Sequence, residues 1–333
     1  MKARFIPRSI AGVALTTVAG CGGGGGGSSL NPPAPPPVEL VKISATNAQT
    51  VAAGVVRSAI EGGHFASLAV PDAAPGDAFS GKAAPLHSKP SAAREGALVE
   101  QSGPVWSQAP VGPMTEPCEL GGTITISGEI ASQSTVSPGD EVTIVFDECA
   151  DGEAVIDGTF SMTVVAFSGS LETGTYSMSA SVDLAAFESV AEEETVAIDG
   201  AAALAIEAAL PRLEFRVSSD SLVIETNGSL HALTDYSLVQ SVDAVTGDYS
   251  IEASGRVSSS RFEGEALFET VEPFVGFAGL HPHIGELLIT GDGGATIRAI
   301  TLDDAFVRIE VDLDGDGRAD FNEDVAWETL TTS

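Results

Sequence analysis

The chain is poor in cysteine, aromatic residues and positive charge. Three cysteines are too few for a disulfide-dense scaffold or a Cys-rich structural zinc site. Only 15 Lys and Arg stand against 47 Asp and Glu, and the net charge of −32 argues against nucleic-acid binding, which requires clustered cations. Aromatic residues make up 6% of the chain, which leaves few large side chains to line an apolar ligand cavity. The motifs Gly-x-Ser-x-Gly, Ser-x-x-Lys and His-Glu-x-x-His are missing, so we expect no enzyme.

What is present is sufficient for a folded protein. The hydrophobic fraction of 43% is normal for a globular core and excludes disorder of the whole chain. At about 100–200 residues per domain, the 333 residues allow one large domain or two modest ones.

The first residues have the pattern of an export signal. Lys2, Arg4 and Arg8 provide positive charge without any acid, and an apolar run from Ile10 to Leu15 follows them. This run is too short to cross a bilayer core of about 30 Å, but it suits the hydrophobic region of a signal peptide. We therefore interpret residues 1–20 as a signal peptide.

The signal ends in Val18-Ala19-Gly20-Cys21, and in this segment the chain resembles bacterial lipoproteins. Their lipobox has a small or aliphatic residue, a small residue, Gly or Ala, and then Cys. The resemblance implies that Cys21 is acylated, as with palmitate, and becomes the mature N-terminus, which attaches the protein to a membrane. Because Gly22 follows Cys21 where Asp would signal inner-membrane retention, the outer membrane is favoured. An ordinary cleaved signal with a coincidental Cys is the alternative.

Residues 21–42 have the composition of a tether. An unbroken glycine run, Gly22–Gly27, precedes a proline-rich stretch at 32–37. Glycine gives a flexible coil and proline a stiffer extended chain. The tether is therefore expected to hold a domain about 20–25 Å from the bilayer.

One helix is predicted over residues 43–62. Thr46 and Gln49 fit a capping box, a stripe of alanine and valine follows, and Gly62-Gly63 would end the helix. Residues 63–114 mix Ala, Pro, Gly and Ser without periodicity, so we interpret them as a flexible linker.

From about residue 115 to 333 the hydrophobic pattern has a period of two. Such alternation places one face of a strand on a core and the other in water. Turn residues such as Asn227-Gly228 separate the alternating segments, and short connections join neighbouring strands antiparallel. The sequence therefore predicts an all-β antiparallel meander, as a barrel, a half-barrel or a sandwich. The clearest strands are Thr123–Ile126, Val142–Phe146, Phe160–Val164, Leu213–Val217, Tyr249–Ala253 and Val307–Val311.

Weak internal repeats are consistent with tandem hairpin units. Ile156-Asp157-Gly158 and Ile198-Asp199-Gly200 each precede an apolar strand, and the segment 174–181 echoes 247–254. The alternative is that any meander repeats its pattern of strands and turns. No fixed period of a propeller is present.

Cys118 and Cys149 bracket the first predicted hairpin, which spans residues 121–148. An oxidising location outside the cytoplasm favours a disulfide between them. The alternation of the two strands pairs even-numbered residues with even-numbered ones. A bridge between Cys118 and Cys149 therefore requires a one-residue irregularity, which we expect at Gly121-Gly122. Two free, buried thiols are the alternative.

The acidic segment 312–323 resembles the calcium loop of EF-hand proteins over its whole length. Alternate residues of such a loop direct oxygens at about 2.3–2.6 Å to the Ca²⁺ ion, and Gly317 stands at the tight turn. Five converging carboxylates would repel one another without a cation. The resemblance implies a Ca²⁺ site with these ligands: Asp312, Asp314, Asp316, the backbone carbonyl of Arg318, Asp320 and Glu323.

Two features depart from the EF-hand pattern. Ala319 stands where the family prefers a larger aliphatic residue, and Phe306–Val311 alternates like a strand where the family has a helix. Downstream, the apolar residues of 321–330 suit one short helix. We therefore expect a lone strand–loop–helix site in which calcium is structural. A solvated acidic turn without a metal is the alternative.

The acidic charge is concentrated in residues 115–333, which contain 41 acids, seven arginines and no lysine. This charge fits either a cation-rich environment or simple solubility. Our first hypothesis is a non-enzymatic outer-membrane lipoprotein, on the periplasmic or cell-surface face, whose calcium-stabilised β domain is a structural or interaction module with another protein as its partner. The second is an envelope carrier that holds a lipid or other apolar ligand in a curved sheet. A hydrolase with paired carboxylates is the third.

Overall fold

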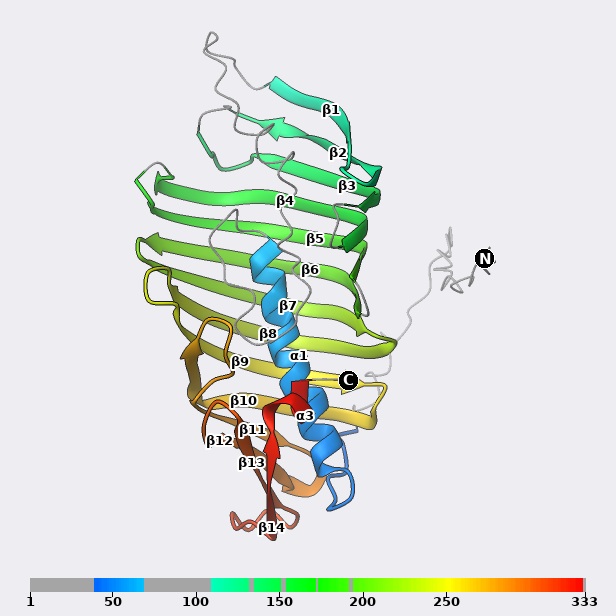
Figure 1. Cartoon of the computed structure of the whole chain (residues 1–333), viewed down its shortest axis with the longest axis vertical. Coiled ribbons are helices and arrows are strands. Elements are labelled where there is room, and N and C mark those ends of the chain that lie inside the picture. The colour runs from blue at the N-terminus through cyan, green and yellow to red at the C-terminus, as the bar shows by residue number, and fades with distance from the viewer. Residues whose placement is uncertain are drawn as a thin grey trace, which may run out of the picture. The chain divides into compact units, whose positions relative to one another are not determined.

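A single antiparallel sheet dominates the described part of the chain (Figure 1). The computed structural model describes residues 39–68, 109–131, 135–150, 154–171, 173–191 and 194–331. The strands are β1 (Ala109–Pro117), β2 (Gly121–Ile130), β3 (Glu141–Ala150), β4 (Ala154–Ser170), β5 (Thr175–Ala191), β6 (Glu194–Ala209), β7 (Arg212–Thr226), β8 (Ser229–Asp243), β9 (Asp248–Ser259), β10 (Phe262–Phe277), β11 (Ile284–Thr290), β12 (Thr296–Thr301), β13 (Phe306–Asp312) and β14 (Phe321–Ala326).

Every strand pairs with its neighbours in the chain, from β1 at one edge of the sheet to β14 at the other. The predicted all-β antiparallel meander is therefore confirmed, and the six clearest predicted strands all lie within strands of the sheet. Because the strands form one sheet with two open edges, the closed barrel and the two-sheet sandwich are excluded for the described residues.

Among the described residues, two α-helices accompany the sheet, α1 (Ala48–Leu68) and α3 (Trp327–Thr331), with a 3₁₀ turn, η2 (Asp292–Gly294), before β12. Helix α1 crosses the strands and contacts β7 through β13 as well as α3 (Figure 1). All nine residues from Val51 to Ala59 are buried, so the centre of α1 is covered on every side. Its small side chains allow close packing: a Cβ on Gly54 would lie only 3.0 Å from the Phe262 ring.

The face of the sheet that packs toward α1 forms the hydrophobic core. Alternate residues of each long strand are buried, as in the middle of β7, where Leu213, Phe215 and Val217 are almost inaccessible. The intervening residues are exposed or half-buried, as period-two alternation requires. The inner face of the sheet therefore supplies most of the apolar surface that folding buries.

A line of β-bulges crosses the sheet from β2 to β9, and only the β7–β8 pair within it keeps a regular register. Non-glycine residues with positive φ occur on β3, β5 and β8, at Glu148, Ala186 and Asp235. Each of them faces a glycine of the adjoining strand, so that a Cβ on Gly158, for example, would lie 2.2 Å from the carbonyl oxygen of Ala186. Bulges bend strands and increase their twist, so this line, which we call the crease, bends the sheet. Its glycines are Gly122, Gly158, Gly200 and Gly255.

The two predicted Ile-Asp-Gly repeats both lie on the crease. Gly158 and Gly200 have φ of +107° and +137°, a region that favours glycine. The amide of Ala186 donates to the carboxylate of Asp199, and the amide of Gly158 donates to that of Asp157. The repeated motif thus corresponds to a repeated bulge, which gives the weak sequence repeat a structural cause.

Cys118 and Cys149 form the predicted disulfide, with their Cα atoms 5.4 Å apart. The predicted irregularity is also present: Gly121 pairs with Ala150, whereas Thr123 pairs with Asp147. Two residues of β3 therefore oppose Gly122, so the extra residue lies on β3. The bridge ties the β1–β2 turn to the end of β3.

The boundaries around α1 differ from those expected. The helix begins at Ala48, and the Thr46 hydroxyl lies 3.1 Å from Oγ of Ser44. It continues through Gly62-Gly63, which we expected to end it. Strand β1 begins inside the predicted linker. The predicted signal peptide (residues 1–20), most of the predicted tether and residues 69–108 of the predicted linker lie outside the described residues.

The last residues of the predicted tether are docked on the sheet. The Val41 amide donates to the Glu265 carbonyl at 2.7 Å, and the Asp292 amide donates to the Val41 carbonyl at 2.8 Å. Val41 is buried, and Leu40 forms a parallel bridge with Glu265. Residues 39–42 therefore belong to the folded unit.

The two edge strands carry features that oppose pairing with another sheet. Strand β1 contains Pro110, Pro113 and Pro117, which lack an N–H donor, and β14 carries the acidic residues Glu323 and Asp324. The open edges are therefore poor templates for aggregation.

Candidate metal site

The acidic segment forms the loop of the β13–β14 hairpin. Val311 pairs with Phe321, and the amide of Asp320 donates to the Val311 carbonyl at 2.8 Å. Continuing this register by one pair places Asp312 directly opposite Asp320, on the same face of the hairpin. Gly315 and Gly317 both have positive φ, which allows the loop to turn tightly.

Three carboxylates converge at the start of this loop. Oxygen atoms of Asp312, Asp314 and Asp320 all lie within 4.8 Å of one another. Asp312 is buried, with 7% of its surface exposed, whereas the other two are exposed. The two exposed carboxylates keep the cluster accessible from solvent, so a cation can reach it.

Backbone amides shape the cluster and fix its charge. Asp312 accepts hydrogen bonds from the amides of Gly315 at 2.8 Å and Gly317 at 2.7 Å, and Asp320 accepts one from Leu313 at 2.8 Å. Burial disfavours the ionised form of Asp312, but the amides around it, led by that of Gly317, outweigh burial and hold its pKa below the usual range. The Asp312 carboxylate is therefore ionised at neutral pH.

The structure brings together three of the five predicted carboxylate ligands. Asp316 accepts a hydrogen bond from the Arg318 amide and lies outside the group, as does Glu323. Glu323 lies on β14 opposite Ile309. Because successive residues of a strand point to opposite faces, Glu323 is on the other side of the hairpin from Asp312. Among the described residues, Asp312, Asp314 and Asp320 are thus the best candidates to hold a metal.

The predicted strand–loop–helix arrangement is wrong in one respect. A strand does enter the loop, but β14 leaves it, and the helix α3 begins only at Trp327. Phe321 and Val325 are four residues apart, a spacing that fits one face of a helix and equally one face of a strand. Pairing with Val311 and Val307 on β13 decides in favour of the strand. The loop consequently connects two strands of a β-hairpin, whereas an EF-hand has a helix on each side of its loop.

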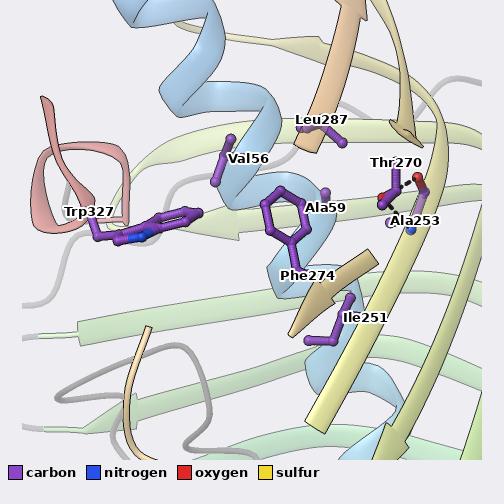
Figure 2. A pocket seen from close by; sticks show the side chains of 8 residues that line it. All are labelled: Val56, Ala59, Ile251, Ala253, Thr270, Phe274, Leu287 and Trp327. Atoms are coloured by element: carbon purple, nitrogen blue, oxygen red, sulfur yellow. Dashed lines mark hydrogen bonds between the residues drawn. The ribbon is translucent and has the colours of Figure 1, made fainter. Parts of the chain in front are cut away.

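A small, mostly apolar cavity lies between α1, α3 and the strands β9–β11 (Figure 2). Its volume is about 10 Å³, which is about the size of one water probe. The hydroxyl of Thr270, drawn with its hydrogen bonds in Figure 2, is engaged by the backbone of Ala253. Since ligand sites measure about 300–1,000 Å³, α1 leaves no room for an apolar ligand at this place. The cavity is lined by Val56, Ala59, Ile251, Ala253, Thr270, Phe274, Leu287 and Trp327.

Comparisons with known proteins give no match: no family model, no curated protein and no solved structure is similar to this chain. Among the helices of the described residues, none combines the length and apolar character needed to cross a membrane.

Proposed function

We propose that this chain is a non-enzymatic lipoprotein of the bacterial outer membrane, whose β domain is an interaction module stabilised by Ca²⁺. The observation that carries the calcium part is the convergence of Asp312, Asp314 and Asp320 on one side of the β13–β14 loop. The donor set fits the ion, because Ca²⁺ is a hard cation that takes oxygen ligands. These carboxylates would hold it, with water and loop carbonyls completing six to eight oxygens.

The disulfide supports a location outside the cytoplasm. Structural disulfides persist in oxidising compartments and are rare in cytosolic proteins. The Cys118–Cys149 bridge therefore fits the signal peptide and lipobox that the sequence indicates.

Ca²⁺ is expected to stabilise the domain through the three clustered carboxylates. At a tenfold excess of Ca²⁺ over Kd, mass action adds about 1.4 kcal/mol to the free energy of unfolding. The Kd is expected at about 10⁻⁴–10⁻³ M, as in extracellular modules. Isothermal titration and chemical unfolding with and without Ca²⁺ measure both quantities.

The variants Asp314→Asn and Asp320→Asn remove exposed charges from the cluster and are expected to abolish the Ca²⁺ effect. Asp316→Asn is the matched control, because this acid lies in the same loop outside the cluster. An equal loss in Asp316→Asn would favour the full EF-hand ligand set. No saturable heat at millimolar Ca²⁺ would end the proposal of a calcium site.

Lipid attachment is expected at Cys21. In a bacterial host, the chain should incorporate labelled palmitate and fractionate with the membranes, whereas Cys21→Ser should lose the label and the membrane association. The double variant Cys118→Ser/Cys149→Ser is the control and should keep the label. Absence of label from the unaltered chain would reject the lipoprotein assignment.

A further inference from the structure

A buried polar contact interrupts the apolar interface between α1 and β8. Nδ1 of His231 on β8 lies 2.9 Å from Oγ of Ser58 on α1, and both residues have no exposed surface. The same Oγ lies 2.7 Å from the carbonyl oxygen of Gly54. A second link lies at the next residue of α1, where the Tyr236 hydroxyl donates to the Ala59 carbonyl at 3.0 Å. We call the Ser58–His231 contact the seam.

The seam suits a neutral imidazole and opposes a charged one. Ser58 has a single hydroxyl proton, and its oxygen is the partner of Nδ1. Nε2 of His231 is buried and has no hydrogen-bond partner among the described residues. A protonated ring carries an N–H at both nitrogens, so its Nε2 proton would be buried without an acceptor. Burying a charge in this way is strongly unfavourable.

The charged groups around the seam add to this effect. Burial is the main cause that lowers the pKa of His231, to about 4, and the guanidinium groups of Arg57 and Arg261 lower it further. Arg57 belongs to α1, and Arg261 lies in the β9–β10 turn, where Ser229 Oγ accepts from its Nε at 3.2 Å. On the adjoining strands, His231 pairs with Ile224 of β7 and Ser259 of β9, neither of which ionises.

We infer that the seam is an acid-sensitive latch, in which protonation of His231 releases α1 from β8 and exposes the apolar inner face of β7–β9. In the unfolded or detached state the imidazole has its ordinary pKa near 6.5. The open form therefore binds more protons than the closed form between about pH 6.5 and 4. The closed form is therefore favoured most strongly above this range, and the free energy that favours it decreases as the pH falls through the range.

Hydrogen exchange of the α1 amides in the full chain tests the latch. After correction for intrinsic rates, exchange in α1 should rise about 100-fold between pH 7 and pH 4, a factor set by the difference between the two pKa values. His231→Gln keeps a side chain that can hydrogen-bond Ser58 but does not titrate. In this variant, exchange in α1 should therefore increase only a few-fold between pH 7 and pH 4. His283→Gln, a substitution away from the seam, is the control and should behave like the unaltered chain.

Arg261→Gln provides a second test that leaves the seam residues intact. Removing this cation should bring the pKa of His231 in the closed form nearer to its value in the open form. The rise of exchange in α1 between pH 7 and pH 4 should therefore become smaller without disappearing. The latch is overturned if His231→Gln and the unaltered chain lose α1 protection together, or if protection persists unchanged to pH 4. If His231→Gln fails to fold, an undiminished response in Arg261→Gln overturns it equally.

Discussion

Replacing Gly158 with alanine is expected to lower the free energy of unfolding by about 2–5 kcal/mol. Gly158 has φ of +107°, which L side chains rarely adopt, and its Cβ would lie 2.2 Å from the carbonyl oxygen of Ala186. The strained backbone costs about 1–2 kcal/mol and the displaced neighbouring strand about 1–3 kcal/mol. Urea unfolding followed by circular dichroism measures the loss.

Gly139→Ala separates the two contributions. Gly139 also has a positive φ, of +88°, but nothing lies within 4 Å of its Cβ position. This control should therefore lose only the conformational part, about 1–2 kcal/mol. Gly200, whose Cβ would lie 2.7 Å from the Ser221 carbonyl, should behave like Gly158. Equal losses at Gly139 and Gly158 would show that close contact across the crease is unimportant.

The strands were predictable because their hydrophobic period is local and strong. Val307, Ile309 and Val311 alternate with Arg308 and Glu310, and they are buried as this pattern requires. The irregularity beside the disulfide was predictable because strand parity restricts which cysteines can meet. The Ile-Asp-Gly repeats gave only a weak indication of the crease. A bulge also depends on the strand that pairs with it, and a local motif does not specify that strand.

Other features depend on partners that are distant in sequence. Gly62-Gly63 resembles a helix end, but glycine inside a helix costs only about 1 kcal/mol per residue, so α1 can continue through it. The spacing of Phe321 and Val325 fits both a helix and a strand, and only β13 decides between them. The extent of the sheet and its open edges likewise follow from pairing, which no single segment specifies.

The candidate metal site was predicted in composition but not in geometry. The spacing of the acids identified the loop, yet the hairpin register selects Asp312, Asp314 and Asp320 and turns Glu323 to the other face. The latch carried no sequence signal at all. Ser58 and His231 are 173 positions apart, and a lone histidine in a strand is not distinctive until α1 packs against it.

Removing the disulfide is expected to cost about 3–4 kcal/mol of unfolding free energy. The bridge closes a loop with a sequence separation of 31, which restricts the unfolded chain. The double variant Cys118→Ser/Cys149→Ser, compared with the unaltered chain by chemical unfolding, measures this loss. Cys21→Ser is the control and should unfold at the same denaturant concentration as the unaltered chain.

The loss should also be unevenly distributed over the sheet. Of the strands that the structure describes, β1 pairs only with β2, and three of its nine residues are prolines, so few backbone hydrogen bonds hold it. Without the bridge, the amides of β1 and β2 should exchange faster than those of β7 and β8, which are held by strands on both sides and by α1. Faster exchange throughout the sheet to the same degree would mean that the bridge stabilises the whole unit and not this edge.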